Sequence, residues 1–406
     1  MVVRAEATVC VVGAGPAGLV VAQRLLASGV SCIVVERQSA DSLCASAKAG
    51  MIEHRSVLAL ERHGLAGPIR ERGGVNGVVE IRVGGQSHVF DYAKLSGGPG
   101  HFVYPQNLLV QAWAASFVER GGVLSFATEA TAIEPHADTE ADDAAGASVR
   151  ARTATGESLC IDCRAVVLAG GAGCELLPAG IEAHEHAYPF RWLTTMVEMT
   201  PLGERTIYAP HERGFAAHLR RSADLTRYYL QIPARDGLEQ WPNERVCAEL
   251  ELRLGVAPGS ILCGNVVARD VMDLRVRVRE PMQRGCVYLA GDAAHLITPA
   301  GGKGMNLAIH DALELSEGLL ERFQRADPVR LSRYSETRLP LIWRAQEFSN
   351  WMLTLHCGGV LGFHRGEPDP DAGFARRLHR AQVERLLSDP GFARWFAHNY
   401  AGVDAS

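Results

Sequence analysis

The segment Ala7–Glu36, ATVCVVGAGPAGLVVAQRLLASGVSCIVVE, decides the fold of this chain. Its pattern predicts a buried strand at 7–12, a glycine-rich turn at 13–18 and a helix at 16–28. A second strand then ends at Glu36. A strand–turn–helix–strand unit of about thirty residues that carries Gly-x-Gly-x-x-Gly is typical of dinucleotide-binding proteins.

The residues of this unit have separate parts in holding a cofactor. Gly13 permits the tight turn, Gly15 lets the backbone approach a pyrophosphate, and Gly18 allows the helix to pack closely on the strand. Glu36 can accept hydrogen bonds from a ribose. Arg37 follows it, and the pair fits FAD or NAD better than a cofactor with a 2′-phosphate. The alternative is a glycine-rich turn in an unrelated α/β protein.

A second candidate region for the same cofactor is Leu289–Asp311, LAGDAAHLITPAGGKGMNLAIHD. A short strand at 286–290 is expected to lead through a loop into a helix that opens near Gly304. A helix start presents unpaired N–H groups and a partial positive charge, which suit an anion or a ring that becomes anionic. Met305 and Asn306 lie where such groups would face a flavin ring.

The composition is that of an ordinary globular chain of 406 residues, with 47% hydrophobic and 21% charged residues. This length suggests two or three structural units. A net charge of −5 argues against a nucleic-acid partner, and no apolar run is long enough for a membrane span. Cys160 and Cys163 form a C-x-x-C in a predicted strand, where free thiols that pack in a reducing cytoplasm are expected. No metal site is expected.

The order of predicted elements indicates an α/β fold in which the nucleotide-binding domain is discontinuous. Residues 1–178 hold its first part, with a substrate-side hairpin near 78–97. Residues 179–272 carry the pattern of a mostly antiparallel sheet. Residues 273–345 return to the Rossmann-like domain, and 346–406 form a helical C-terminal region.

Ordered matches along nearly the whole chain carry a resemblance to a known family. They are GAGPAGL at 13–19, ERQ at 36–38, DYAKLSGG at 91–98, YPF at 188–190, RGFA at 213–216, RYYLQIP at 227–233, EPMQRG at 280–285, GDAAHLITPAGGKGMNLA at 291–308, WMLTLH at 351–356 and NYAG at 399–402. The chain resembles the class A flavoprotein aromatic hydroxylases, and among them the 4-hydroxybenzoate 3-monooxygenase family. The resemblance implies an FAD-binding domain of the glutathione-reductase type.

The resemblance also implies further cofactor-binding residues. Besides the glycine turn, Glu36 and Arg37, these are Lys48, Gln106, Arg227, Asp292, Lys303, Gly304, Met305 and Asn306. Arg227 matches an arginine that bridges the flavin and substrate regions. Taken alone, Asp292 is a strand-end aspartate that could instead cap the next turn.

Five residues match substrate-binding or catalytic positions of the family. Arg221 matches an arginine that pairs with the substrate carboxylate, and Tyr229 a further carboxylate contact. Tyr208 matches the tyrosine that bonds the phenolic oxygen, and Tyr400 its proton-relay partner. Pro299 matches a proline whose carbonyl faces the substrate hydroxyl. The chemistry agrees, because a guanidinium binds a carboxylate bidentately and a tyrosine can pass on a phenol's proton. The alternatives are core tyrosines and surface arginines.

Several positions depart from the family pattern. Leu219 replaces a serine near the carboxylate site, which affects substrate choice. Asn76 replaces the histidine at which the relay ends, so water or another group must exchange the proton. Ser46 and Lys48 stand where the family has arginines, and Gly170 replaces an aspartate. These last changes affect how NAD(P)H docks, so that weak nicotinamide use or a separate flavin reductase is an alternative.

The expected activity is that of an FAD-dependent monooxygenase that uses O2 and NAD(P)H. It would hydroxylate a 4-hydroxybenzoate-like acid ortho to its hydroxyl through a flavin C4a-hydroperoxide. The first alternative is a hydroxylase of an amino-hydroxybenzoate or other aryl acid in a biosynthetic pathway, fed by external reduced flavin. The others are a flavoprotein oxidase or reductase without hydroxylation and a non-catalytic binding protein. A cytoplasmic homodimer is implied by resemblance alone.

Overall fold

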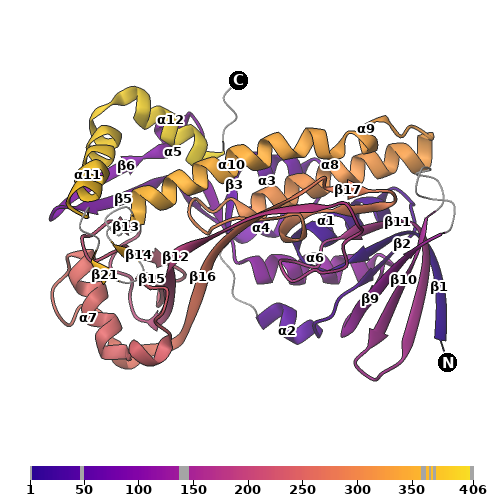
Figure 1. The fold of residues 1–406 in the computed structure, drawn as a ribbon, viewed down its shortest axis with the longest axis horizontal. Coiled ribbons are helices and arrows are strands. Elements are labelled where there is room, and N and C mark those ends of the chain that lie inside the picture. Colours follow the sequence, from indigo (N-terminus) through magenta and orange to yellow (C-terminus); the bar gives the residue numbers. More distant parts are fainter. Residues whose placement is uncertain are drawn as a thin grey trace. The chain divides into compact units, whose positions relative to one another are not determined.

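The computed structural model describes residues 2–45, 50–136, 146–357, 363–364, 367–368 and 372–402. The chain forms two compact units (Figure 1). Unit 1 comprises Met1–Gly74, Phe102–Glu185 and Val276–Gln346, and unit 2 comprises Val75–His101, His186–Arg275 and Glu347–Ser406. The expected α/β class is confirmed, while the domain limits expected at 178, 272 and 345 remain a prediction.

Unit 1 is built on a mostly parallel sheet. Its strands, in the order β17-β18-β11-β1-β2-β8, are Gln283–Arg284, Val287–Leu289, Ser158–Leu168, Val2–Val12, Cys32–Val35 and Val123–Ser125, and the antiparallel β10 (Ala147–Thr153) and β9 (Thr128–Pro135) extend from β11. All four residues of β2 are buried, as expected for a parallel strand covered on both faces. The carboxyl ends of these strands hold the loops that form the candidate cofactor site.

Helices cover this sheet and close its core. They are α1 (Pro16–Ala27), α2 (Ala40–Ala45), α3 (His54–Glu61), α4 (Gly67–Arg72), α6 (Gln106–Glu119), α8 (Gly304–Arg325) and α9 (Val329–Ser332), and two short strands, β3 (Met51–Glu53) and β19 (His295–Leu296), lie between them in sequence. Helix α1 packs on both α6 and α8. It begins with a proline in its first turn, where a missing N–H costs nothing.

Unit 2 is built on a second sheet, which is mostly antiparallel. Its strands run in the order β19-β16-β12-β15-β14-β13-β5-β6. After β19, which pairs with the end of β16, they are Val266–Glu280, Glu182–Glu198, Leu225–Pro233, Ala216–Arg220, Thr206–Ala209, Val78–Val83 and Gln86–Asp91. Strands β12 and β16 and helix α10 (Tyr334–Cys357) each begin in one unit and end in the other. The remaining elements are β4 (Gly74–Asn76), α5 (Tyr92–Ser96), β7 (His101–Val103), α7 (Asn243–Leu254), β20 (Phe363–His364), β21 (Glu367–Pro368), α11 (Ala372–Ser388) and α12 (Pro390–Ala401).

The two faces of the unit 2 sheet have different surroundings. Tyr228 and Leu230 of β15 form a buried core with Val246 and Leu250 of α7. Because side chains alternate along a strand, the residues between them project from the opposite face. That opposite face carries most of the residues expected to bind the substrate.

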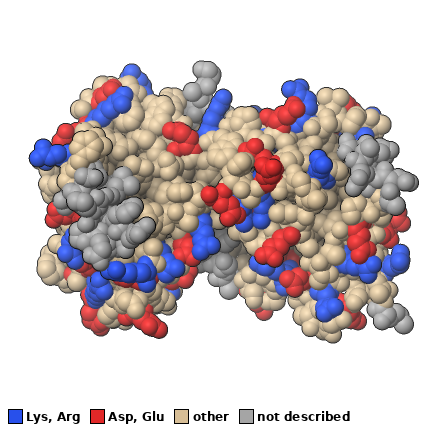
Figure 2. Space-filling view, in the orientation of Figure 1, with Lys and Arg blue, Asp and Glu red and all other residues tan. Residues whose placement is uncertain are grey.

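Several expectations from composition can be compared with the structure. No described helix is long and apolar enough to cross a membrane. In the described part of the chain, no group of three or more potential ligands could hold a metal ion, and Cys160 and Cys163 are free thiols. Figure 2 shows Lys and Arg interspersed with Asp and Glu over the viewed face.

Candidate active site

Of the three glycines in the turn of unit 1, one leaves room for a ligand. Gly13 has a φ of +106°, and a Cβ there would lie 2.4 Å from the carbonyl oxygen of Ala169. A Cβ at Gly18 would lie 1.9 Å from the carbonyl oxygen of Gly13. At Gly15, by contrast, a Cβ would meet nothing within 4 Å. The turn is therefore closed by Gly13 and Gly18 and open at Gly15, beside the N–H groups that begin α1.

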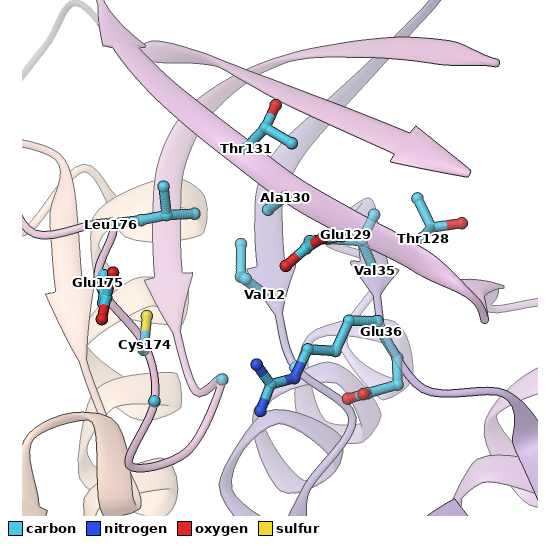
Figure 3. Close-up of a pocket in the computed structure, with 14 residues that line it drawn as sticks. Val12, Val35, Glu36, Thr128, Glu129, Ala130, Thr131, Cys174, Glu175 and Leu176 are labelled. Carbon is cyan, nitrogen blue, oxygen red and sulfur yellow. The ribbon is translucent and has the colours of Figure 1, made fainter. Parts of the chain in front are cut away.

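A cavity of about 360 Å³ lies beside this turn (Figure 3). It is lined by Val12, Gly13, Val35, Glu36, Arg37, Thr128, Glu129, Ala130, Thr131, Gly170, Gly173, Cys174, Glu175 and Leu176. The sequence analysis singled out Gly170 of the segment after β11. It missed the wall that β9 supplies and the residues 173–176, because these carry no motif.

The carboxylate of Glu36 is already engaged in the fold. Its Oε2 accepts a hydrogen bond from the N–H of Ala14 at 2.8 Å, and its Oε1 accepts one from Gln38 at 2.9 Å. These bonds fix the carboxylate against the glycine turn at the edge of the cavity. Each oxygen keeps a second lone pair, so a ribose hydroxyl could still bind there.

The loop after β18 is anchored by one buried carboxylate, that of Asp311. It accepts hydrogen bonds from the Gly291 N–H at 3.0 Å and from Arg338 Nε at 2.8 Å, and His295 Nε2 lies 2.5 Å from it. Burial alone would raise the pKa of Asp311, but the attraction of His295 and Arg338 lowers it to about 2. Sequence reasoning missed this role, because Arg338 comes from a separate segment and the Leu289–Asp311 segment carries no motif that pairs Asp311 with His295.

The side chains expected near the flavin at the start of α8 are bound within unit 1. Lys303 Nζ donates to Glu53 Oε1 at 2.6 Å, and burial lowers the lysine's pKa while Glu53 raises it. Asn306 Oδ1 accepts from the Glu53 N–H at 2.9 Å, and its Nδ2 donates to the carbonyl oxygens of Met51 and Gly302. The backbone N–H groups at the start of α8, including that of Met305, are the donors that the sequence led us to expect near FAD.

The other expected residues of unit 1 lie as follows. Asp292 is partly buried in the short turn Gly291–Ala293, and Gln106 is the first residue of α6. The carbonyl oxygen of Pro299 accepts a hydrogen bond from Gly302 at 3.1 Å. Ser46 and Lys48 lie outside the described residues.

In unit 2, strand register brings several expected residues to one face. Ala217 lies opposite Tyr208 on one side and Tyr229 on the other, and Leu219 lies opposite Arg227. Directly paired residues of neighbouring strands project from the same face. Tyr208 and Tyr229 are thus two strands, or roughly 10 Å, apart in one row.

An aromatic wall stands over this row. The Tyr208 ring stacks on that of His356 with centroids 4.5 Å apart, and His356 stacks on Phe215 at 4.7 Å. Trp192 contacts both Phe215 and Tyr229, with centroids at 5.2 and 5.3 Å. Sequence reasoning missed His356 and Phe215 as site residues, although both belong to matched motifs.

Arg221 is a partly buried cation at the end of this face. Burial lowers its pKa, Tyr229 raises it and Arg227 lowers it further. No carboxylate is among the described groups that affect this pKa. A charge that is removed from water without an opposite charge is costly, so this guanidinium is suited to bind an anion.

The two tyrosines expected to move a proton are hydrogen-bonded to each other. Their hydroxyl oxygens, Tyr208 Oη and Tyr400 Oη, lie 2.8 Å apart. Burial raises the pKa of Tyr208 to about 12 and that of Tyr400 well above its usual value. Both phenols are therefore neutral near pH 7, and each can donate a proton and accept another.

Asn76 is held in place by its own side chain. Its Nδ2 donates to Thr206 Oγ1 at 3.2 Å, and its Oδ1 accepts from the Val78 N–H at 3.1 Å. The amide side chain thus has a structural part and cannot titrate near neutral pH.

The open glycine turn, the neighbouring cavity and the helix start define a dinucleotide-dependent flavoprotein fold, and their residues fit FAD. Residues 6–349 match the family described as "FAD binding domain". The chain is 32% identical to the p-hydroxybenzoate hydroxylase of Acinetobacter baylyi, over 97% of this chain and 95% of that protein. It is 26% identical to the pentachlorophenol 4-monooxygenase of Sphingobium chlorophenolicum, over 90% of this chain and 67% of that protein.

A solved structure gives the same result for the fold. The p-nitrophenol 4-monooxygenase PnpA of Pseudomonas putida DLL-E4 superposes with a TM-score of 0.81 at 21% identity, over 99% of this chain and 100% of that one. The chain therefore belongs to the FAD-binding family of class A flavoprotein aromatic monooxygenases. It is an FAD-dependent aromatic hydroxylase.

Replacing Gly15 with alanine should weaken FAD binding without unfolding the protein. The backbone at Gly15 has a φ of −73°, which alanine adopts, but the added methyl group would take the space open to a pyrophosphate. We expect the FAD dissociation constant to rise at least about tenfold, or roughly 1.4 kcal/mol. Flavin fluorescence titration of the apoprotein measures it. Gly67→Ala, at another uncrowded position of unit 1, is the control, and equal FAD affinity in both variants would contradict the assignment.

Replacing Asp311 with asparagine should destabilise the protein by about 3 kcal/mol at pH 7, because the buried guanidinium of Arg338 loses its charge partner. Since the folded-state pKa of Asp311 is about 2, below its unfolded value, its ionic contribution is present above pH 4 and is lost as the pH falls toward 2. The difference between wild type and variant should therefore shrink with acidification. Urea unfolding at pH values from 7 to 3 measures this, with the exposed Asp41→Asn as control.

Proposed function

We propose that this hydroxylase acts on a 4-hydroxybenzoate-like aromatic acid and adds oxygen ortho to its hydroxyl group. The observation that carries the proposal is the partly buried Arg221 guanidinium, which has no carboxylate among the described groups that affect its pKa. Tyr229 lies beside this cation, and the Tyr208–Tyr400 hydroxyl pair lies further along the same sheet. A single aromatic ring with a carboxylate at one end and a hydroxyl at the other can bridge the two places.

Each residue of the unit 2 site has a proposed part in the reaction. Arg221 binds the carboxylate as a bidentate donor, and Tyr229 adds a hydrogen bond. Tyr208 holds the phenolic oxygen and takes its proton while passing its own to Tyr400. Removal of this proton makes the ring a better nucleophile.

The aromatic wall of Trp192, Phe215 and His356 keeps water away from the reacting ring. When bound, FAD would react with O2, and the transferred oxygen atom comes from that reaction. The parts proposed for unit 1 are to hold this cofactor through Gly13, Gly15, Gly18, Glu36, Arg37, Gln106, Asp292 and the backbone of residues 303–306. Lys48 is proposed to contribute as in the family. The parts of Arg227 and of the Pro299 carbonyl are proposed from the family resemblance alone.

The reductant is proposed to be NAD(P)H. Gly170 lines the cavity beside Glu36 where the family has an aspartate, so reduction by NADH, by NADPH or by a separate reductase is a matter for measurement. Stopped-flow flavin reduction with each nicotinamide, with and without aryl acid, separates these cases. A homodimer in the cytoplasm is proposed from the family resemblance.

A second candidate substrate is a ring that carries an additional amino or hydroxyl group, such as an amino-hydroxybenzoate. Two observations favour it. Leu219 offers no hydroxyl opposite Arg227, so the carboxylate end differs from the family pattern. In the described part of the chain, the buried Nδ1 of His356 has no hydrogen-bond partner, although this ring stacks on Tyr208.

Product analysis tests the proposed reaction directly. The FAD-loaded protein is incubated with O2, NADH or NADPH, and either 4-hydroxybenzoate or an amino-hydroxybenzoate. We expect a product that has gained one oxygen atom. Hydrogen peroxide equal to the nicotinamide consumed, with no oxygenated product from any acid, would indicate a flavoprotein oxidase instead.

Replacing Arg221 with alanine should raise the KM for the aromatic acid roughly 10- to 100-fold, because a charge-assisted hydrogen bond contributes about 1.5–3 kcal/mol. The KM of Arg221→Lys should lie between those of Arg221→Ala and the wild type, since lysine keeps the charge but lacks the planar guanidinium. The neighbouring Arg220→Ala is a matched control, because Arg220 is exposed and pairs with Glu204. An unchanged KM in Arg221→Ala would remove this residue from the substrate site.

A further inference from the structure

We infer that His101, oriented by Tyr92, is the group that accepts the substrate's proton from the Tyr208–Tyr400 pair. This inference rests on the proposed function, since it needs a phenolic substrate to release that proton. The four residues belong to unit 2, and the contacts among them carry the argument.

Tyr400 lies at the centre of an aromatic cluster. Its hydroxyl bonds that of Tyr208, and its ring meets the rings of Tyr92 and His101 edge to face, with centroids 4.8 and 5.1 Å away. Tyr92, His101 and Tyr400 are all fully buried. Burial raises the pKa of Tyr400, and Tyr208 and Tyr92 raise it further. A proton that reaches Tyr400 therefore has His101 and Tyr92 as its neighbours.

The hydrogen bonds of Tyr92 fix which nitrogen of His101 can act as a base. The Tyr92 hydroxyl donates to the carbonyl oxygen of Asn76, which can only accept. Its oxygen lies 2.9 Å from His101 Nδ1 and therefore accepts a hydrogen from that nitrogen. The neutral imidazole then carries its lone pair on Nε2. Tyr92 thus holds His101 in the tautomer whose second nitrogen can take a proton.

His101 is the group in this cluster whose ordinary pKa lies near neutrality. Burial raises the pKa of Tyr92, as it does for Tyr208 and Tyr400. These neutral phenols can therefore accept one proton while they donate another, but none of them is the base that finally holds the substrate's proton. The rings of Tyr92 from α5 and Tyr400 from α12 pack against the His101 ring.

The backbone brings His101 to the place where the family has a different base. A Cβ at Gly100, whose φ is +87°, would lie 2.4 Å from the Asn76 carbonyl oxygen, so only glycine allows the two segments to approach so closely. The resemblance aligns Asn76 with the histidine that ends the family's relay. The asparagine here keeps a structural part, and His101 lies across its backbone as the titratable group.

The transfer balances without any further reactant. The substrate's O–H bond breaks as a new O–H bond forms on Tyr208, whose own proton moves to Tyr400. The proton of Tyr400 moves to His101 Nε2, which leaves a phenolate and an imidazolium. No electrons are exchanged, and the reverse sequence restores the resting state.

Ionisation of a bound ligand tests the relay without turnover. The oxidised, FAD-loaded protein is mixed with 4-hydroxybenzoate in a stopped-flow instrument. Phenolate absorbance and a pH-indicator dye follow the loss of the proton across a range of pH values. We expect His101→Gln to slow ionisation at least about tenfold and to change its pH dependence, with the ligand's dissociation constant and the FAD content close to wild type.

Further variants separate a relay from a structural effect. Tyr92→Phe keeps the ring but removes the hydroxyl that orients His101, and should slow ionisation to a smaller extent. Adding Asn76→His to His101→Gln should restore much of the rate, because it returns a titratable group to the family's position. His88→Gln makes the same substitution on β6 of unit 2 and should ionise the ligand at the wild-type rate.

The outcomes distinguish this inference from the proposed function. Wild-type rate and pH dependence of ionisation in His101→Gln would overturn the relay assignment, even if the protein hydroxylates the ligand. A wild-type protein that neither ionises nor hydroxylates a phenolic acid would overturn both. A slow His101→Gln variant that Asn76→His does not rescue, and whose pH dependence matches wild type, would assign His101 a packing part only.

Discussion

The loop between β18 and α8, in the last segment of unit 1, depends on one buried negative charge. Asp311 is fully buried, yet it stays ionised because Gly291, His295 and Arg338 surround it with donors. The loop between β18 and α8 is rich in glycine, so its own conformational preferences are weak. Its shape, and with it the direction of the N–H groups at the start of α8, is imposed by this carboxylate. Glu53 has a similar part on the other side of the helix start, through Lys303 and Asn306.

In unit 2, side chains alternate between the two faces of the sheet, so that residues of the core and residues of the site lie on opposite faces. Every second residue of β15 packs against α7, and the residues between them, Arg227 and Tyr229, are left for the site. The site face can therefore hold a cation with a lowered pKa and several hydroxyl groups without a break in the core below it. This arrangement explains how Leu219 can replace a serine of the family: the change alters the site and leaves the core as it is.

The sequence predicted those parts in which a local pattern has one physical meaning. The glycine turn, the strands beside it and the start of α8 follow from short-range spacing, and the structure has them. The resemblance pointed to Tyr208 and Tyr400, whose hydroxyls are indeed bonded. What could not be predicted comes from long-range meetings of ordinary residues. The sequence around Asp311 does not predict its contact with Arg338, and no motif around His101 predicts its hydrogen bond to Tyr92. The side chain of Glu36 and the N–H groups at Met305 and Asn306 were expected to face a cofactor. The bonds of the Glu36 and Asn306 side chains to the backbone were not foreseen.

The interleaving of the two units has a consequence for how the chain is made. A ribosome releases the three segments of unit 1 separated by two segments of unit 2, and β18 joins its sheet only after residue 287 has emerged. Neither core can close on a nascent chain until most of the polypeptide is out of the exit tunnel. Unpaired strands of both sheets thus coexist during synthesis, a condition in which chaperones are needed.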